Sequence, residues 1–116
     1  MSETLLLMTY LIVKHFFLDF TIMQPPYMWM NKGNIKHPGG YLHAGLHVLF
    51  STIVIHSWPI LLFEFISHYA MDWTKVNINK RMGWGPTTHS QWFVLLGVDQ
   101  LVHYITYIIM IALYVN

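Results

Sequence analysis

Residues 92–115 read WFVLLGVDQLVHYITYIIMIALYV, a stretch that is apolar along most of its length but carries Asp99, Gln100 and His103. A transmembrane helix needs about 20 mostly apolar residues to cross roughly 30 Å of hydrocarbon. Ionisable residues within such a helix are costly, and they usually face the interior of a helix bundle. The stretch therefore predicts a membrane helix that turns one polar face towards partner helices.

The composition of the whole chain agrees with this prediction. Of its 116 residues, 55% are hydrophobic and only 9% are charged, which leaves too few charges to cover a soluble globule of this size. A soluble four-helix bundle is the alternative, but helices that are hydrophobic nearly all round favour lipid contact. The absence of cysteine excludes disulfides and thiolate metal sites. The formal net charge of +1 gives no support to nucleic-acid binding.

Breaks in the sequence divide the chain into four predicted spans. The paired prolines after Gln24 end the first span, because proline lacks the N–H donor that a helix interior needs. The stretch Ser57-Trp58-Pro59 separates the second span from the third, because proline suits the first turn of a new helix. We therefore expect an all-α integral membrane four-helix bundle that forms one domain over residues 1–116. The expected spans are approximately residues 4–23, 41–57, 60–80 and 91–114.

The basic residues predict how these spans are oriented. The first and third connections, with the span ends beside them, contain Lys32, Lys36, Lys75, Lys80 and Arg81. The opposite side has essentially no basic residue, so the positive-inside rule places both long connections in the cytoplasm and both termini outside. The N-terminus lacks a basic region and a small-residue cleavage site, so we expect a retained first span in the cell (inner) membrane.

Each predicted span carries one pair of His or Asp residues whose spacing puts both side chains on the same face of a helix. The pairs are His15 and Asp19, His43 and His47, His68 and Asp72, and Asp99 and His103. All four pairs fall at similar depths, so their side chains can meet inside a bundle. The direction of each span then predicts two layers. The layer nearer the cytoplasm holds the three aspartates and His43, and the deeper layer holds His15, His47, His68 and His103.

A metal centre is the simplest common explanation for these eight residues. Imidazole and carboxylate groups suit divalent transition metals, and eight of them are enough for two ions that share a bridging aspartate. We therefore expect one or two divalent ions, zinc in the first place and otherwise manganese or iron. A hydrogen-bonded polar core without metal is the alternative. Bis-histidine haem binding fits less well, because stacked pairs with three aspartates suit a compact metal centre better than a porphyrin.

Several other polar residues have two interpretations. Candidates to orient the ligands or to hold an anionic substrate are Lys14, Gln24, Lys75 and Gln100. For the two lysines, the alternative is that they snorkel to the cytoplasmic surface. Glu64 lies one turn before His68 and either extends the same stripe or lies at the outer interface. The three histidines outside the pattern, which we expect to be solvated or near an interface, are His37, His56 and His89.

The motifs KHFFLDF, HAGLH, HYAMDWTK and DQLVH, together with Gln24 and Asn31-Lys32, resemble the domain of unknown function 3307 family of small bacterial and phage membrane proteins. The resemblance extends from end to end. It implies a multi-span membrane protein whose signature is the set of paired His and Asp positions, and it implies no activity. Membrane-bound metal-dependent hydrolases with HxxxH and HxxxD helices have a similar site chemistry, which is an analogy and no evidence of common descent.

The expected function is that of a membrane-embedded metal-binding protein which acts as a metal-dependent hydrolase. Its substrate would be a lipid or lipid-linked compound at the cytoplasmic face, where a bound metal can activate water and polarise an ester. The lipid bilayer is the expected partner. One alternative is a protein that binds or transports metal ions or protons. Another is a small phage or bacterial membrane effector with a structural polar core.

Overall fold

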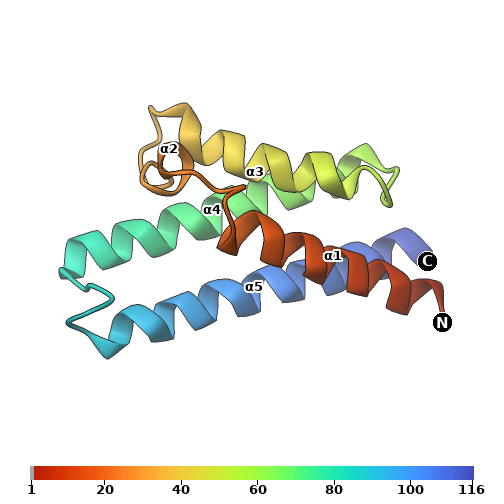
Figure 1. The fold of residues 1–116 in the computed structure, drawn as a ribbon. Helices are drawn as coiled ribbons and strands as arrows, with labels where there is room; N and C mark the ends of the chain where they lie inside the picture. Colours follow the sequence, from red (N-terminus) through yellow and green to blue (C-terminus); the bar gives the residue numbers. More distant parts are fainter. Residues whose placement is uncertain (1) are drawn as a thin grey trace.

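The structure, a computed structural model, describes residues 2–116. It contains the helices α1 (Glu3–Phe20), α2 (Pro26–Trp29), α3 (Pro38–Ser51), α4 (Trp58–Met82) and α5 (Ser90–Val115) (Figure 1). No strand occurs among the described residues. The predicted all-α class is therefore confirmed.

The four long helices form a closed ring. Helix α1 contacts α3 and α5, α4 contacts the same two helices, and the short α2 packs on α3. Both termini lie at one end of the molecule together with the α3–α4 turn, which we call the terminal end (Figure 1). Helix α2 and the α4–α5 connection lie at the opposite end, which we call the loop end. The interior of the ring is therefore bounded by four helices and has two distinct ends.

Local sequence signals explain several helix boundaries. The Ser2 hydroxyl accepts a hydrogen bond from the backbone N–H of Leu5 at 3.3 Å and caps α1. Pro59 lies in the first turn of α4, as the sequence predicts, and Gly83 ends this helix with a left-handed φ of 70°. Helix α3 begins three residues before the predicted span, because Nδ1 of His37 accepts a hydrogen bond from the N–H of Gly39 at 2.9 Å. His37 is thus a helix cap.

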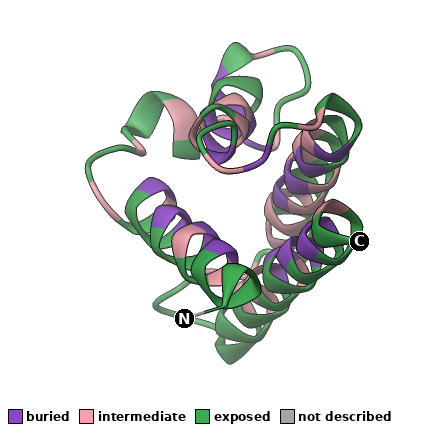
Figure 2. Cartoon of the chain, turned by 90° about the vertical axis from the view of Figure 1, so that its right-hand side faces the viewer, coloured by how far each residue is buried: buried purple, intermediate pink, exposed green. Residues whose placement is uncertain are grey.

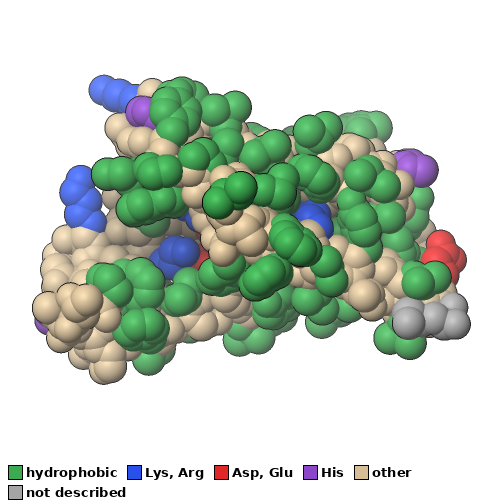
Figure 3. All heavy atoms as spheres, in the orientation of Figure 1, with side chains coloured by type: hydrophobic (Ala, Val, Ile, Leu, Met, Phe, Trp, Pro, Cys, Tyr) green, Lys and Arg blue, Asp and Glu red, His purple; other side chains and the backbone are tan. Residues whose placement is uncertain are grey.

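The interior is more polar than the surface of the long helices. Among the described residues, nine hydrophobic and twelve polar or charged residues are buried, so polar groups are the majority inside. Large hydrophobic side chains are exposed on all four long helices instead. Figure 2 shows buried positions along the inward faces of the helices and exposed positions outside, and Figure 3 shows hydrophobic side chains over much of one face. Soluble proteins have the opposite distribution of polar groups.

The inward positions follow a spacing of four residues on every long helix, which keeps them on one face. The inward stripes are Leu7, Leu11, His15 and Asp19 on α1; His43, His47 and Ser51 on α3, continued by Ile55 in the α3–α4 turn; Ile60, Glu64, His68 and Asp72 on α4; and Asp99, His103, Tyr107 and Ile111 on α5. The apolar members pack together as a core cluster that includes Leu7, Leu11, Ile55, Ile60 and Ile111. Each stripe thus runs from apolar residues at the terminal end to His and Asp towards the loop end.

One helix of the described chain, α5, is long and apolar enough to cross a membrane by its own composition, with a mean hydropathy of 1.7 in its most apolar window. Helix α1 carries Lys14 and Asp19, which lower its hydropathy. Helix α3 ends at Ser51, six residues before the end of the predicted span, and its 14 residues cover only about 21 Å. Helix composition therefore establishes one candidate span and leaves the other three as a proposal.

Candidate metal centre

The structure brings the eight predicted site residues together between the four long helices. Their side chains are almost completely buried, and the most exposed is Asp19 at 6%. We call this set the His–Asp cluster. Its members are His15, Asp19, His43, His47, His68, Asp72, Asp99 and His103. Each long helix contributes two of them, because residues four apart lie on one helix face.

Four imidazole rings, one from each long helix, form a closed circuit within the cluster. The ring centroids are 5.2 Å apart between His15 and His47 and 4.0 Å apart between His47 and His68. The circuit closes through His103, whose centroid is 4.1 Å from that of His68 and 5.1 Å from that of His15. These are the four histidines that the order of residues along the spans assigns to one layer. The fifth histidine of the cluster is His43, whose ring centroid lies 4.8 Å from that of His47.

The carboxylate of Asp19 contacts three of these imidazoles. Its Oδ1 is 2.9 Å from Nε2 of His43 and 2.9 Å from Nε2 of His47. Its Oδ2 is 2.9 Å from Nε2 of His15. One carboxylate from α1 thus joins the histidines of α1 and α3.

Asp72 has the corresponding position on the other side of the cluster. Its Oδ2 is 3.0 Å from Nε2 of His68 and 3.6 Å from Nε2 of His43, and its Oδ1 is 3.3 Å from Nε2 of His103. The same Nε2 of His103 is 3.0 Å from Oδ1 of Asp99. The histidines of α4 and α5 are therefore joined by carboxylates from their own helices.

Three groups of these residues have donor atoms within 4.8 Å of one another, close enough to hold a metal ion. The groups are Asp19, His43, His47 and His68; His68, Asp72 and His103; and Asp19, Asp99 and His103. Every two of these groups share one member. Adjacent ions with shared ligands are therefore compatible with the arrangement, and Asp19 belongs to two groups as a bridging carboxylate would.

Unpartnered buried atoms show that the residues fit a divalent ion. Nε2 of His43, Nε2 of His68 and Oδ1 of Asp99 have no hydrogen-bond partner among the described residues. Each nevertheless lies within 3.0 Å of an opposite ionisable group, so the distances are short but the hydrogen-bond alignment is missing. Buried polar atoms rarely lack partners, because the lost hydrogen bond is costly. Donor atoms that converge without being aligned on one another are the arrangement expected around a metal.

His15 differs from the other predicted ligands, because it belongs to none of the three groups. Its Nδ1 lies 2.8 Å from the Tyr107 hydroxyl, and its Nε2 lies 2.7 Å from Oε1 of Gln100. Gln100 also donates a hydrogen bond to Oδ2 of Asp99 at 2.9 Å. Both nitrogens of His15 are thus engaged with the protein, which suits a residue that orients Asp19.

Lys14 and Glu64 form a buried ion pair beside the histidine circuit. The Lys14 ammonium is 2.6 Å from Oε2 of Glu64 and donates to the backbone oxygen of His47 at 3.0 Å. Ser51 donates to the same Oε2 at 3.0 Å. The snorkelling interpretation of Lys14 is therefore wrong, since its side chain is only 2% exposed, and Glu64 extends the inward stripe of α4.

The histidines excluded on the basis of sequence lie outside the cluster. His37 caps α3, as described above. His56 is exposed, and His89, also exposed, precedes α5 with its Nδ1 2.8 Å from the Thr88 hydroxyl. The pairing pattern therefore separates the clustered histidines from the others.

A ring of four helices around five imidazoles and three carboxylates defines an all-helical protein with a candidate metal centre in its interior. The chain belongs to the family described as "Protein of unknown function (DUF3307)", which matches residues 7–116. The family resemblance seen in the sequence is thereby confirmed. No curated protein and no solved structure matches the chain.

Proposed function

We propose that the chain is a multi-span membrane protein whose His–Asp cluster binds one or two divalent ions, zinc in the first place, and acts as a metal-dependent hydrolase. The substrate is a lipid or lipid-linked ester at the cytoplasmic face. The observation that carries the proposal is the convergence of buried imidazole and carboxylate atoms, among them Nε2 of His43, Nε2 of His68 and Oδ1 of Asp99, which lack a hydrogen-bond partner among residues 2–116. Such donor sets suit divalent transition metals.

The distribution of side chains supports a membrane location for all four long helices. Polar and charged groups lie inside, and large apolar side chains cover the outside, which is favourable where lipid replaces water. On α1, Lys14 and Asp19 point into the cluster while Leu6, Val13 and Phe17 are exposed. The charges that lower the hydropathy of α1 are thus hidden from lipid. We infer an integral membrane four-helix bundle in the cell (inner) membrane.

Cysteine labelling tests the orientation of this bundle. Because the basic residues gather near the two connections of the loop end, these connections are cytoplasmic and both termini lie outside. The chain has no cysteine of its own, so Asn34→Cys and Asn116→Cys each introduce a single exposed thiol. We expect an impermeant maleimide to label Asn116→Cys in intact cells and Asn34→Cys only after permeabilisation. The reverse pattern would invert the orientation.

The residues of the cluster have distinct roles in this proposal. Asp19 is the shared carboxylate, and His15 holds it in place while Tyr107 and Gln100 fix the imidazole of His15. The apolar core cluster at the terminal end keeps water out from that side. A bound divalent ion supplies Lewis-acid activation of water and of an ester oxygen. The same apolar core cluster interrupts any polar path through the bundle, so we favour hydrolysis over ion or proton transport.

Metal content is the direct test of the centre. Protein purified in mild detergent without chelator is expected to contain one or two zinc ions per chain by elemental analysis. Removal of the ions should lower its thermal stability, because a ligand that binds only the folded state stabilises that state. Natively folded protein that contains no metal, and whose stability a chelator leaves unchanged, would favour the hydrogen-bonded polar core instead.

A further inference from the structure

A pocket of about 350 Å³ reaches the His–Asp cluster from the loop end. We call it the vestibule. Its wall includes Asp19 of the cluster together with Gln24, Lys32, Lys75, Asn79 and Trp92. These residues come from α1, α4, α5 and the two connections that flank α2. The vestibule is therefore the approach to the cluster on the side opposite the apolar core cluster.

Two lysines lie between the cluster and the vestibule. Lys32 is only 6% exposed. Its ammonium lies 3.7 Å from Oδ2 of Asp72, which is a long distance for an ion pair. The Lys75 ammonium lies 3.1 Å from Oδ2 of Asp99. A lysine ammonium has three N–H donors. Each lysine thus has donors left for a ligand in the vestibule.

The backbone fixes the position of Lys32. Gly40, in the first turn of α3, packs directly against it, and a Cβ atom at this glycine would come within 3.1 Å of the Lys32 Cα. Lys75 is held by its place on α4, one turn before Asn79. The fold thus places both ammonium groups beside carboxylates of the cluster, so the binding site for a ligand is preorganised.

The charges of the interior favour an anion once metal is bound. Three lysines and four carboxylates are buried or nearly so, namely Lys14, Lys32, Lys75, Asp19, Glu64, Asp72 and Asp99. With neutral histidines, these groups leave one negative charge in excess. One divalent ion changes the excess to one positive charge, and two ions change it to three. Uncompensated charge in an interior of low dielectric is unfavourable, so the centre with bound metal ions favours an anionic ligand.

We propose that the vestibule binds the phosphate group of a phosphate monoester, held by Lys32 and Lys75. The inference rests on the proposed function and names the substrate class of the same centre. A phosphate has several oxygens, so it can accept hydrogen bonds from two lysines on separate segments while another oxygen faces the cluster. In the hydrolysis, water forms a new P–O bond, the ester P–O bond breaks, and a proton of the water goes to the departing alcohol. Trp92 in the wall suits the level of lipid headgroups.

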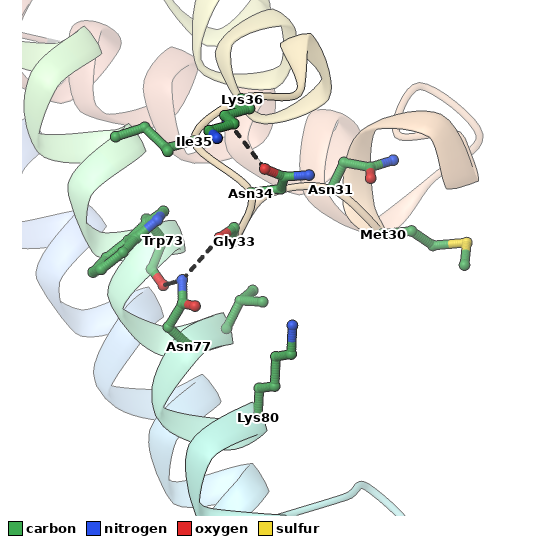
Figure 4. A pocket seen from close by; sticks show the side chains of 10 residues that line it. Met30, Asn31, Gly33, Asn34, Ile35, Lys36, Trp73, Asn77 and Lys80 are labelled. Carbon is green, nitrogen blue, oxygen red and sulfur yellow. Dashed lines mark hydrogen bonds between the residues drawn. The ribbon is translucent and has the colours of Figure 1, made fainter.

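Calorimetric titration of purified, metal-loaded protein with inorganic phosphate tests the proposal. Lys32→Gln and Lys75→Gln are each expected to weaken phosphate binding about ten-fold, because each removes a charge-assisted hydrogen bond. Lys75→Arg keeps the charge and should bind within about three-fold of the unaltered protein. The matched control is Lys36→Gln, which should leave binding unchanged. Lys36 is an exposed lysine of the loop end that lines a separate hollow with Asn77 and Lys80 (Figure 4).

A second variant covers the case in which the lysine variants fold poorly. Asn79→Asp adds a negative charge to the wall and leaves both lysines in place, so it is expected to weaken phosphate binding to a similar extent. Equal binding by Lys32→Gln, Lys75→Gln and Asn79→Asp, with full metal content, would overturn the vestibule proposal while the metal centre stands. Lysine-dependent binding by protein that contains no metal would support the vestibule and remove the metal centre.

The source of the phosphate group is decided by a second titrant. A short-chain phosphatidic acid carries a phosphate monoester on a lipid, and binding about ten-fold tighter than inorganic phosphate would assign a lipid substrate. Equal affinity for both would assign a soluble phosphate ester. Binding of short-chain phosphatidylcholine as tight as that of phosphatidic acid would contradict the proposal, because that diester headgroup carries no net charge.

Discussion

The Asp19→Asn variant is expected to lose more than about 100-fold in metal affinity, because loss of a mere orienting partner typically costs about 10–100-fold. Asp19 contacts three histidines through its two oxygens and belongs to two of the three candidate ligand groups. Asparagine keeps the shape of the side chain and removes its charge and one oxygen ligand. Elemental analysis after dialysis against a competing chelator measures the loss, and circular dichroism verifies that the helices are retained.

Two further variants serve as controls for the Asp19→Asn variant. Gln100→Ala removes the contacts to His15 and Asp99 but no predicted ligand, so its loss should stay within about 10–100-fold. His56→Ala alters an exposed histidine outside the cluster and should leave the metal content unchanged. If Asp19→Asn kept full metal content and stability while His56→Ala lost both, the assigned centre would be wrong.

The same centre should depend on residues far apart in the sequence. Asp99→Asn and His103→Ala alter α5, whereas His43→Ala and His47→Ala alter α3, yet all four should reduce the metal content. Double-mutant combinations of one residue from each helix should lose less than the sum of the single losses, because groups that hold one centre act as a unit. Additive losses would instead indicate separate, independent sites.

The clustering of His and Asp could be predicted because it depends on the four-residue spacing within each helix and on the depth of each pair along its span. Residues four apart share a helix face in any bundle, so the pair Asp99 and His103 indicates an inward stripe before any contact is known. Equal depth along the spans then brings the pairs from different helices together. The apolar residues at the terminal end continue the same spacing, and Leu7 and Leu11 precede His15 on α1.

Contacts that depend on the position of loops could not be predicted in this way. The contact of Lys32 with Asp72 requires the connection after α2 to fold back against Gly40. The cap that His37 provides moves the start of α3 to Pro38. Neither the Lys32–Asp72 contact nor the His37 cap follows from a periodic pattern in the sequence. His15 has the spacing of a ligand, but its two hydrogen-bond partners on α5 are visible only in three dimensions.

Lys14 is a candidate from the sequence to orient ligands or to hold a substrate, but its buried ion pair with Glu64 is not predicted there, although its own helix carries a signal for burial. Leu7, Leu11, Lys14 and Leu18 are spaced by four, three and four residues, which is the pattern of one buried helix face, and all four are buried. A lysine at such a position needs an anionic partner. That partner, Glu64, lies 50 residues further along the chain, so spacing alone could not reveal the pair.

The Lys14→Met variant is expected to lower the free energy of unfolding by about 3–5 kcal/mol, because it leaves the Glu64 carboxylate buried without its cation. Both side chains of this ion pair are at most 2% exposed. The double variant Lys14→Met/Glu64→Gln removes both charges and keeps a group that Ser51 can bond, so it should recover most of the loss. Chemical unfolding in detergent, followed by tryptophan fluorescence, measures all three proteins.

Lys36→Met is the matched control, because Lys36 is exposed at the loop end, and its change should stay within about 0.5 kcal/mol. A loss for Lys14→Met as small as that of the control would mean that the Lys14 side chain reaches water, as in the snorkelling interpretation. A double variant less stable than Lys14→Met alone would mean that the charge of Glu64 is compensated elsewhere. Only a recovery of stability in the double variant identifies the buried pair as the source of the loss. Such a recovery shows that the effects of the two charges on stability depend on each other.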